Sequence, residues 1–327
     1  MRILQNSHIP FVGIRYWAYA ISIILIIAGI AGLLINGLNW SIDFTSGVAA
    51  KVNLKAKDTN VSPLKIDELR EVLKSNGFPE AEIQHVGDPA NASFMIKMKS
   101  KSNTADVSTD TKGKILDIIT TNFPEYVKGK DVAKDVIEEI YEVGPKVGGE
   151  LRTSALLAVL ASLVLMIVYI WFRFELTFGL MAILALFHDV IIIVGIFAIT
   201  GKEITVQIIA ALLTIVGYSI NDTIVIFDRI REDLKTYRKD PVEDVFNRAI
   251  NNTLSRTVIT SGTTMFSALA LFFFGGSVLH DFAFAMVLGV FFGTYSSIFV
   301  ASNLVIDITH ATHKERSTIQ HLTKRKK

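Results

Sequence analysis

Four ionisable side chains lie within long apolar stretches of this sequence. They are His188, Asp189, Asp222 and Arg256. A charged side chain inside a membrane costs several kcal/mol, so residues of this kind usually face a polar interior, where they form a pair or an ion pathway. A buried carboxylate that gains and loses contact with a guanidinium can bind and release a cation in alternation.

Asp222 and Arg256 are predicted to enter two consecutive membrane helices from the same end. Asp222 precedes Asp228 by about six residues, which places it about 9 Å above that end at 1.5 Å per residue. The long side chain of Arg256 can reach this depth if the two helices are neighbours. The alternative is that Arg256 extends to the lipid headgroups. We predict that Asp222 and Arg256 form a pair.

Polar residues continue along both helices at helical spacing. On the first helix they are Gln207, Thr214, Tyr218 and Asn221, and on the second they are Thr260, Thr264 and Ser267. Such stripes can hold water, but they can also serve packing alone, because small and hydroxyl side chains let membrane helices approach closely. The motif Gly289-x-x-x-Gly293 is typical of packing.

His188 and Asp189 are adjacent, so a helix directs their side chains about 100° apart. At most one of them is therefore expected to face the same cavity as Asp222. For His188 we favour a hydrogen-bonded position inside the bundle. For Asp189 a role in an ion pathway and a structural role remain equally open.

The apolar stretches that carry these residues predict an integral membrane protein. The chain of 327 residues is 50% hydrophobic and 20% charged, and its mean hydropathy of +0.43 is high for a soluble protein. A helix needs about 20 apolar residues to cross a membrane. The segments that qualify are 16–35, 151–172, 176–199, 204–227, 257–275 and 282–308. We interpret 16–35 as a retained anchor, because its apolar run is longer than that of a signal peptide and no cleavage site precedes Trp40.

The short loops indicate how these helices are oriented, because Lys and Arg collect on the cytoplasmic side. One side carries Arg2, Arg15, Arg173, Arg229, Arg231, Lys235, Arg238, Lys239, Arg248 and the tail from Lys324 to Lys327. The short loops of the other side contain only Lys202. We therefore predict cytoplasmic segments at 1–15, 228–256 and 309–327, with both termini cytoplasmic, and an exported region at 36–150. An amphipathic helix starting at Pro241 is either a solvated connector or a docking site.

The region 36–150 has the pattern of a folded α+β domain. Strands are predicted at 48–54, 82–86, 93–99 and 137–143, and helices at 62–76, with Ser62 as N-cap, and at 111–122. A turn at Gly87-Asp88-Pro89 separates the second and third strands, and 59–61 and 101–111 are expected to be loops. The order β-α-β-β-α-β is that of a ferredoxin-like domain.

Composition also excludes several classes of function. The net charge is +2, and the basic residues flank apolar segments without forming a basic domain, so nucleic-acid binding is not expected. The chain contains no cysteine, which rules out disulfides, thiolate metal sites and cysteine nucleophiles. We expect no metal, no cofactor and no enzymatic activity.

Several motifs resemble those of the SecF family, part of the bacterial SecD–SecF protein-export complex and related to the RND (resistance-nodulation-division) transporters. One motif is 40–47, with Asp43, Phe44, Thr45 and Gly47, and a second is 143–148, with Gly144 and Pro145. Others are 172–175 with His188 and Asp189, 217–223 continuing to 227–231, and 252–257. The family usually has two glycines after Asp-Phe-Thr, whereas Ser46 precedes Gly47 here.

The resemblance implies a polytopic membrane protein with six helices of RND type and one ferredoxin-like extracytoplasmic domain, located in the bacterial inner membrane. It also implies that the protein acts together with a SecD-like subunit. The two subunits would use the proton gradient to help complete the export of polypeptides from the SecYEG channel. YajC-like and YidC-like proteins are further expected partners. The residues that match Asp222 and Arg256 are those implicated in proton conduction. Tyr218, Asn221, Thr260, Thr264 and Ser267, which helical spacing places near them, are predicted to be supporting polar residues. The coupling ion is expected to be a proton or sodium.

Three other functions fit parts of the pattern. An RND-type exporter of lipids or small molecules would share the polar stripe but needs an apolar cleft in its exported domain. A structural scaffold would tolerate uncharged residues at both Asp222 and Arg256. An intramembrane aspartyl protease could use Asp189 and Asp222, but the sequence lacks the Gly-x-Gly-Asp context expected of that class.

Overall fold

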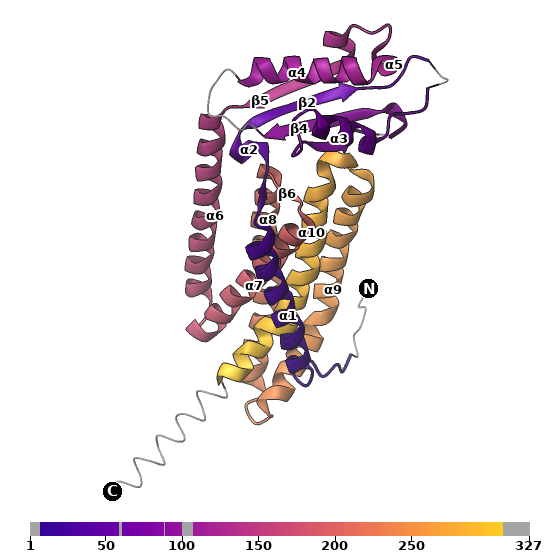
Figure 1. Cartoon of the computed structure of the whole chain (residues 1–327). Coiled ribbons are helices and arrows are strands. Elements are labelled where there is room, and N and C mark those ends of the chain that lie inside the picture. Colours follow the sequence, from indigo (N-terminus) through magenta and orange to yellow (C-terminus); the bar gives the residue numbers. More distant parts are fainter. Residues whose placement is uncertain (1–6, 59–60, 88, 100–106, 310–327) are drawn as a thin grey trace.

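The computed structural model describes residues 7–58, 61–87, 89–99 and 107–309 of the chain. A bundle of long helices carries a small α+β domain at one end (Figure 1). Arg2, the basic tail after Thr309, Asp88 of the predicted turn and most of the predicted loop 101–111 lie outside the described residues.

Six helices are long and apolar enough to cross a membrane, which confirms the prediction of a polytopic helical membrane protein. Their bounds are α1 Arg15–Asn36, α6 Pro145–Arg173, α7 Leu176–Thr200, α8 Val206–Thr236, α9 Val242–Phe274 and α10 Gly276–Tyr295. A π-helix, Ser296–Ala301, extends α10, and the last span continues to Thr309. Most of the segment 228–256 is helical, because α8 continues to Thr236 and α9 starts directly after Pro241.

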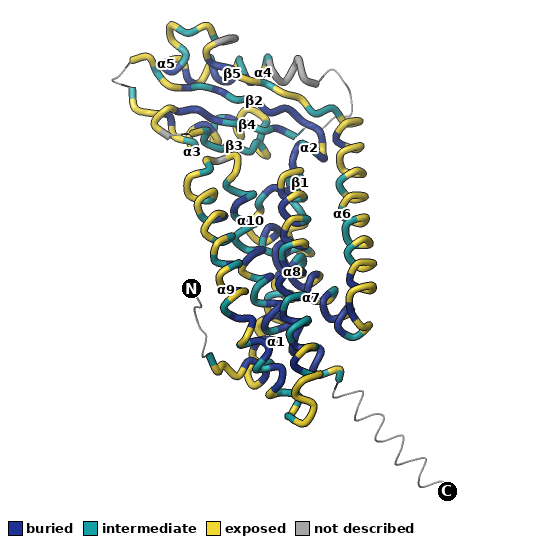
Figure 2. The backbone as a smooth tube through the Cα atoms, turned by 180° about the vertical axis from the view of Figure 1, so that it is seen from behind, coloured by how far each residue is buried: buried dark blue, intermediate teal, exposed yellow. Residues whose placement is uncertain are grey.

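The helices differ in how deeply they are buried. Helices α7, α8 and α10 form the centre of the bundle, whereas α6 stands at its edge and exposes apolar residues along its length (Figure 2). The most exposed of these include Leu160, Leu165, Trp171 and Phe172. A helix that is apolar all round and hardly buried by its own chain is suited to contact with lipid or with another membrane helix.

Glycines allow the closest helix contacts. A Cβ atom at Gly195 of α7 would lie 2.4 Å from the Cα of Gly29 on α1, so neither residue can carry a side chain without moving these helices apart. A Cβ at Gly289 of α10 would lie 2.3 Å from Ile215 of α8, and one at Gly293 would lie 3.0 Å from Ser219. The predicted packing role of the Gly289-x-x-x-Gly293 motif is therefore confirmed.

The domain between α1 and α6 is built on a sheet in which all neighbouring strands are antiparallel. Its strands are β2 Gly47–Asn53, β3 Glu82–His85, β4 Ser93–Lys99 and β5 Ile137–Val143, in the spatial order β3-β4-β2-β5. Its helices are α3 Ile66–Ser75, α4 Val107–Asn122 and the short α5 Pro124–Val127, with a short 3₁₀ turn Pro89–Asn91 and a π-turn Val132–Val136. Alternate residues of β4, such as Phe94 and Ile96, are fully buried against these helices, as expected for a sheet covered on one face.

Helix α3 starts later than the sequence pattern predicts. Its N-cap is Lys65 and not Ser62, so the predicted start of this helix is wrong. The backbone carbonyl of Ser62 instead accepts a hydrogen bond from the hydroxyl of Tyr126 (3.0 Å). This contact with Tyr126 of α5 keeps Ser62 outside the helix, although Ser62 and Pro63 are residues typical of a helix start.

A second, two-stranded sheet joins the domain to the bundle. Strand β1 (Asn39–Trp40), which follows α1, pairs in parallel with β6 (Glu203–Ile204), which connects α7 to α8. The short helix α2 (Ile42–Thr45) then leads into β2 and packs against the first turns of α6. The sheet of the domain therefore begins only a few residues after the chain leaves the membrane bundle.

Candidate functional site

Asp222 is buried in the middle of α8, with a side chain that faces α9. Only 3% of the residue is exposed. The carboxylate oxygen Oδ2 accepts a hydrogen bond from the hydroxyl of Ser261 on α9 (3.1 Å), and the hydroxyl of Thr260 also lies within hydrogen-bonding range. The packing of α8 against α9 brings these groups together. A hydroxyl group of α9, and not a basic side chain, therefore holds the carboxylate.

Arg256 lies one turn before these hydroxyls on α9. The predicted pair with Asp222 is not formed among the described residues: the guanidinium influences the carboxylate electrostatically, but the two side chains form no ion pair. Arg256 is exposed at the surface of the chain. The guanidinium therefore lies near the carboxylate without a direct contact.

The predicted polar stripe on α9 is largely turned away from Asp222. The hydroxyls of Thr264 and Ser267 donate hydrogen bonds to carbonyl oxygens one turn earlier in their own helix, and Ser267 is exposed. Thr260 also bonds within its helix while remaining close to Asp222. Of the three predicted residues on α9, Thr260 is the one that the structure brings to the site.

The predicted residues on α8 divide between two sides of the helix. Tyr218 is half-buried, and its hydroxyl has no hydrogen-bond partner among the described residues. Asn221 is exposed and lines a cleft of about 640 Å³ between α6 and α8, together with Gly217 and Tyr169. Asn221 therefore faces α6, whereas its neighbour Asp222 faces α9.

Sequence reasoning missed Ser261, the residue that donates to Asp222. Its hydroxyl also accepts a hydrogen bond from Thr294 of α10 (2.7 Å), so a chain of hydroxyl groups joins Asp222 to a third helix. Small or polar side chains at Thr257, Ser261 and Ala268 mark the buried face of α9. This spacing of four and seven residues was the signal that could have identified Ser261.

His188 and Asp189 contact each other at the centre of the bundle. The imidazole Nδ1 of His188 lies 2.9 Å from Oδ1 of Asp189, and its Nε2 lies 3.0 Å from the hydroxyl of Ser22 on α1. The predicted hydrogen-bonded position of His188 is confirmed. Both residues are almost completely buried. Although adjacent positions on a helix diverge, the long His188 side chain turns back towards its neighbour, so the two side chains share one polar cluster.

The other oxygen of Asp189 connects α7 to α8 and to the last span. It accepts hydrogen bonds from the hydroxyls of Ser219 (2.6 Å) and Ser296 (2.9 Å). Ser296 begins the π-helix, whose wider turn places Ser296 and Ser297 together on the buried side. Ser219 and Asp222 lie three residues apart on α8, so Asp189 and Asp222 occupy neighbouring but separate polar clusters.

The motif that contains Asp43, Phe44, Thr45 and Gly47 fastens the domain to the bundle. Ser41 caps α2 by accepting from the backbone N–H of Asp43 (3.2 Å), and Thr45 donates to the Ser41 carbonyl (3.0 Å). The carboxylate of Asp43 accepts from the backbone N–H of Val206 (3.4 Å), at the first turn of α8. Phe44 is buried and packs edge-to-face on Trp40.

The second motif starts α6. Gly144 is the N-cap and Pro145 the first residue of this helix, where the missing N–H of proline costs nothing. A Cβ at the nearby Gly148 would lie 3.2 Å from the backbone nitrogen of Ser46. The two motifs therefore meet where β2 leaves α2. Within the described residues, no group of three or more His, Asp or Glu side chains is arranged to hold a metal ion.

Comparison with known proteins identifies the family. Residues 124–311 match the family described as protein export membrane protein SecD/SecF, C-terminal. This region contains Asp189, Asp222, Ser261 and the five helices α6 to α10. The chain belongs to the SecD/SecF family.

Members of the SecD/SecF family resemble the chain over nearly its whole length. The protein translocase subunit SecF of Desulfurispirillum indicum is 38% identical over 306 residues, which are 93% of this chain and 92% of the relative. SecF of Thermodesulfovibrio yellowstonii is 41% identical over 94% of this chain and 96% of the relative. The SecDF protein of Thermus thermophilus is 42% identical over 93% of this chain but only 39% of its own length.

A solved SecD/SecF structure has the same fold. The crystal structure of SecDF from Thermus thermophilus, described as a translocon-associated membrane protein, matches 94% of this chain with a TM-score of 0.77 and 40% sequence identity. The match covers 40% of that longer chain. The match includes most of the α+β domain, because the unmatched 6% of the chain is much shorter than this region.

Proposed function

We propose that the chain is a SecF-type subunit of the Sec protein translocase that assists the export of polypeptides across a membrane. The observation that carries this proposal is the identity of about 40% to proteins named SecF over more than nine-tenths of both sequences. Similarity that extends over nearly the full length of both proteins supports the same role more strongly than a shared fold would. Six membrane helices are consistent with it.

The partner of this subunit is a SecD-like protein. The chain corresponds to about two-fifths of the SecDF protein of Thermus thermophilus, and the proposed SecD-like partner would correspond to the remainder of that protein. The SecYEG channel, YajC-like and YidC-like proteins and the translocating polypeptide complete the set of proposed partners. The exposed apolar faces of α6 and α9 provide surface for contact with other membrane helices.

In this proposal, the movement of protons through Asp222 supplies the energy for polypeptide export. The proposed relay consists of Asp222 and Arg256, with Ser261 and Thr260 as hydroxyl ligands of the carboxylate. Approach of Arg256 favours the ionised carboxylate and expels the proton, whereas its withdrawal favours proton binding. An elementary charge that crosses the membrane releases about 2.3 kcal/mol per 100 mV, which is enough to bias a two-state movement of helices. Sodium is the alternative coupling ion, because a carboxylate with hydroxyl groups can bind either cation.

In this proposal the protein is an inner-membrane protein with both termini in the cytoplasm and the α+β domain outside. Arg173 ends α6, Arg229 and Arg231 lie in the last turns of α8, and Arg248 lies in the first turns of α9; this clustering supports a cytoplasmic position for that end of the bundle. The sheet order β3-β4-β2-β5 with two crossing helices supports a ferredoxin-like assignment for the domain. Movement of this domain would accompany ion passage through the bundle.

Export into inverted membrane vesicles tests the proposal. Vesicles that lack the endogenous SecF-type subunit are supplemented with this chain and its SecD-like partner, and export of a secretory polypeptide is measured with and without a proton gradient. We expect the chain to purify together with the SecD-like partner and to increase export only when the gradient is present. Export that does not respond to the chain, although the two subunits purify together, would contradict the proposed function.

A further inference from the structure

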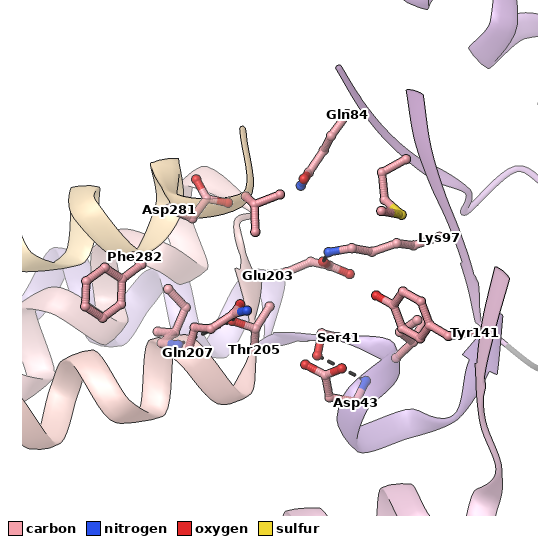
Figure 3. Close-up of a pocket in the computed structure, with 14 residues that line it drawn as sticks. Ser41, Asp43, Gln84, Lys97, Tyr141, Glu203, Thr205, Gln207, Asp281 and Phe282 are labelled. Carbon is pink, nitrogen blue, oxygen red and sulfur yellow. Dashed lines mark hydrogen bonds and ion pairs between the residues drawn. The ribbon is translucent and has the colours of Figure 1, made fainter. Parts of the chain in front are cut away.

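Two carboxyl groups from distant parts of the chain meet at the seam between the α+β domain and the bundle. Glu203 lies on β6, just before α8, and Glu82 is the first residue of β3, at the edge of the domain sheet. The side chain of Lys97 on β4 points across the seam to Glu203 (Figure 3). None of these three residues belongs to the relay around Asp222.

Glu203 is a buried carboxylate with only one of its oxygens satisfied. The residue is 4% exposed. Its Oε2 accepts from the ammonium of Lys97 (2.7 Å), while its Oε1 is buried and has no hydrogen-bond donor among the described residues. A buried carboxylate oxygen without a donor is costly, so a donor at this position would stabilise the seam. Glu82 lines the same cavity as Glu203, and the two carboxyl groups influence each other.

Glu82 can supply that donor when it carries a proton. Its Oε1 accepts from the side-chain amide of Asn39 on β1 (2.7 Å), whose own oxygen accepts from Lys99 (2.5 Å). Burial, and then the neighbouring Glu203 carboxylate, raise the pKa of Glu82 to about 7. Two neighbouring carboxyl groups cannot both ionise at low cost, and they share one proton. The proton on Glu82 would satisfy the free oxygen of Glu203.

Other charged groups surround the pair on every side of the seam. The ammonium of Lys97 contacts the carboxylate of Glu203 at 2.7 Å, so Glu82 is the group that would carry the proton. Lys202 is held by Asp281 of α10 (2.5 Å), which reduces its effect on the pair. The remaining titratable groups that line the adjoining cavities are Arg70 of α3, Asp43 of α2 and Tyr141 of β5. A cavity of about 120 Å³ lies beside Glu203 and Lys97, and a second cavity is lined by both Glu82 and Glu203.

We propose that Glu82 and Glu203 form a proton-binding site at the seam, in which one shared proton holds the domain against the membrane bundle. The proton closes the hydrogen-bonded chain Lys99–Asn39–Glu82–Glu203–Lys97, which crosses from the domain to β1 and β6 and back. Loss of the proton leaves two negative charges facing one lysine and weakens the contact. The site lies outside the membrane and is independent of the proton relay proposed at Asp222.

The direction of the pH effect follows from the pKa of Glu82. Its pKa is about 7 in the docked domain and close to the ordinary value of 4.5 when the seam is open and solvated. The docked form therefore binds the proton more tightly, so docking is strongest below the lower value and weakens as the pH rises towards about 7. Each unit of pKa difference changes the docking equilibrium by up to about tenfold, less any screening by water.

Infrared difference spectroscopy of the full chain in lipid vesicles tests for the shared proton. As the pH is raised through about 7, we expect loss of a protonated carboxylic acid band. This band should be absent from Glu82→Gln and altered in Glu203→Gln, and it should remain in Glu80→Gln, which changes an exposed carboxylate two residues away. The band should also persist in Asp222→Asn, which separates this site from the proposed relay. A spectrum in which neither Glu82→Gln nor Glu203→Gln changes a band in this range would overturn the proposal.

Thiol labelling tests whether the proton controls docking. The chain has no cysteine, so Gln84→Cys introduces a single thiol in the cavity at the seam, and Glu80→Cys provides an exposed reference. We expect the ratio of the two labelling rates to rise several-fold as the pH is raised. The ratio should be independent of pH when Glu82→Gln is also present, because glutamine donates to Glu203 at every pH. An equal pH dependence with and without Glu82→Gln would contradict control of docking by this proton.

Discussion

Ser261 of α9 donates a hydrogen bond to the buried carboxylate of Asp222 on α8 at 3.1 Å. Arg256, which the sequence pairs with Asp222, lies five residues before Ser261 and acts on the same carboxylate without forming an ion pair in the part of the chain that the structure describes. The carboxylate of Asp222 thus accepts a hydrogen bond from a neutral hydroxyl group, while the guanidinium of Arg256 lies nearby without a direct contact. This relationship leads to the first two predictions.

Replacement Asp222→Asn is expected to abolish the increase in export that depends on the proton gradient. The amide cannot bind or release a proton, but it keeps an oxygen that accepts from Ser261, so membrane insertion and association with the SecD-like subunit should be normal. Export into inverted vesicles measures the effect. Glu232→Gln, at an exposed position on the same helix, is the control and should behave as the unchanged protein. Full stimulation by Asp222→Asn would rule out this residue as the relay.

Replacement Ser261→Ala should reduce gradient-dependent export by about two- to tenfold, which corresponds to the loss of about 0.5–1.5 kcal/mol for one hydrogen bond. Thr260 and Arg256 remain near Asp222, so activity should be reduced but not eliminated. Ser267→Ala removes a hydroxyl that is exposed and bonds within its own helix. Equal effects of the two replacements would mean that the bond from Ser261 to Asp222 has no special role.

Replacement Asp189→Ala is expected to lower stability by about 1–3 kcal/mol, because it leaves Ser219, Ser296 and His188 without their shared acceptor inside the bundle. Thermal unfolding of the purified protein in detergent measures the loss. Asp189→Asn retains one acceptor and should be less harmful. Glu175→Ala, where the carboxylate is 76% exposed, should leave the unfolding temperature unchanged. A normal unfolding temperature for Asp189→Ala would argue against a structural role.

Replacement Ser46→Gly should stabilise the protein by about 1 kcal/mol. Ser46 has φ 74° and ψ 151°, a backbone conformation that glycine adopts freely and other residues adopt only with strain. Its position matches one of the two glycines that the family usually has there. Thermal unfolding again provides the measurement. Ser62→Gly, at a position without positive φ, should bring no gain, and a similar gain there would show that strain at Ser46 is not the cause.

The membrane helices could be predicted from the sequence because each one is encoded by a continuous apolar segment. Uninterrupted apolar segments predicted the six helices. Depth along two consecutive helices predicted a pair of Asp222 and Arg256, but the two side chains form no ion pair among the described residues. The direction in which a side chain faces was harder to predict. Ser261 and Thr264 are equally good hydroxyl residues in the sequence, and the rotation of α9 against α8 decides that Ser261 meets Asp222.

Contacts between distant segments could not be predicted from local patterns. Glu82 and Glu203 come together only because β1 pairs with β6 and brings the edge of the domain sheet over the loop between α7 and α8. The cluster of Asp189 depends on the π-helix at Ser296, which interrupts the regular spacing on which helical patterns rest. Similarly, the contact of His188 with Asp189 depends on a side-chain conformation, which the spacing of two adjacent residues does not indicate.

The pairing of β1 with β6 has a mechanical consequence. Strand β6 ends at Ile204, and α8 begins at Val206, with Asp222 about 24 Å further along the same unbroken helix at 1.5 Å per residue. A force applied to the domain is therefore transmitted to the carboxylate of Asp222 along one continuous helix, which is attached to the domain by a connection of a single residue between β6 and α8. Pulling or twisting the domain would shift Asp222 relative to Ser261, and displacement of Asp222 would pull on the domain in return.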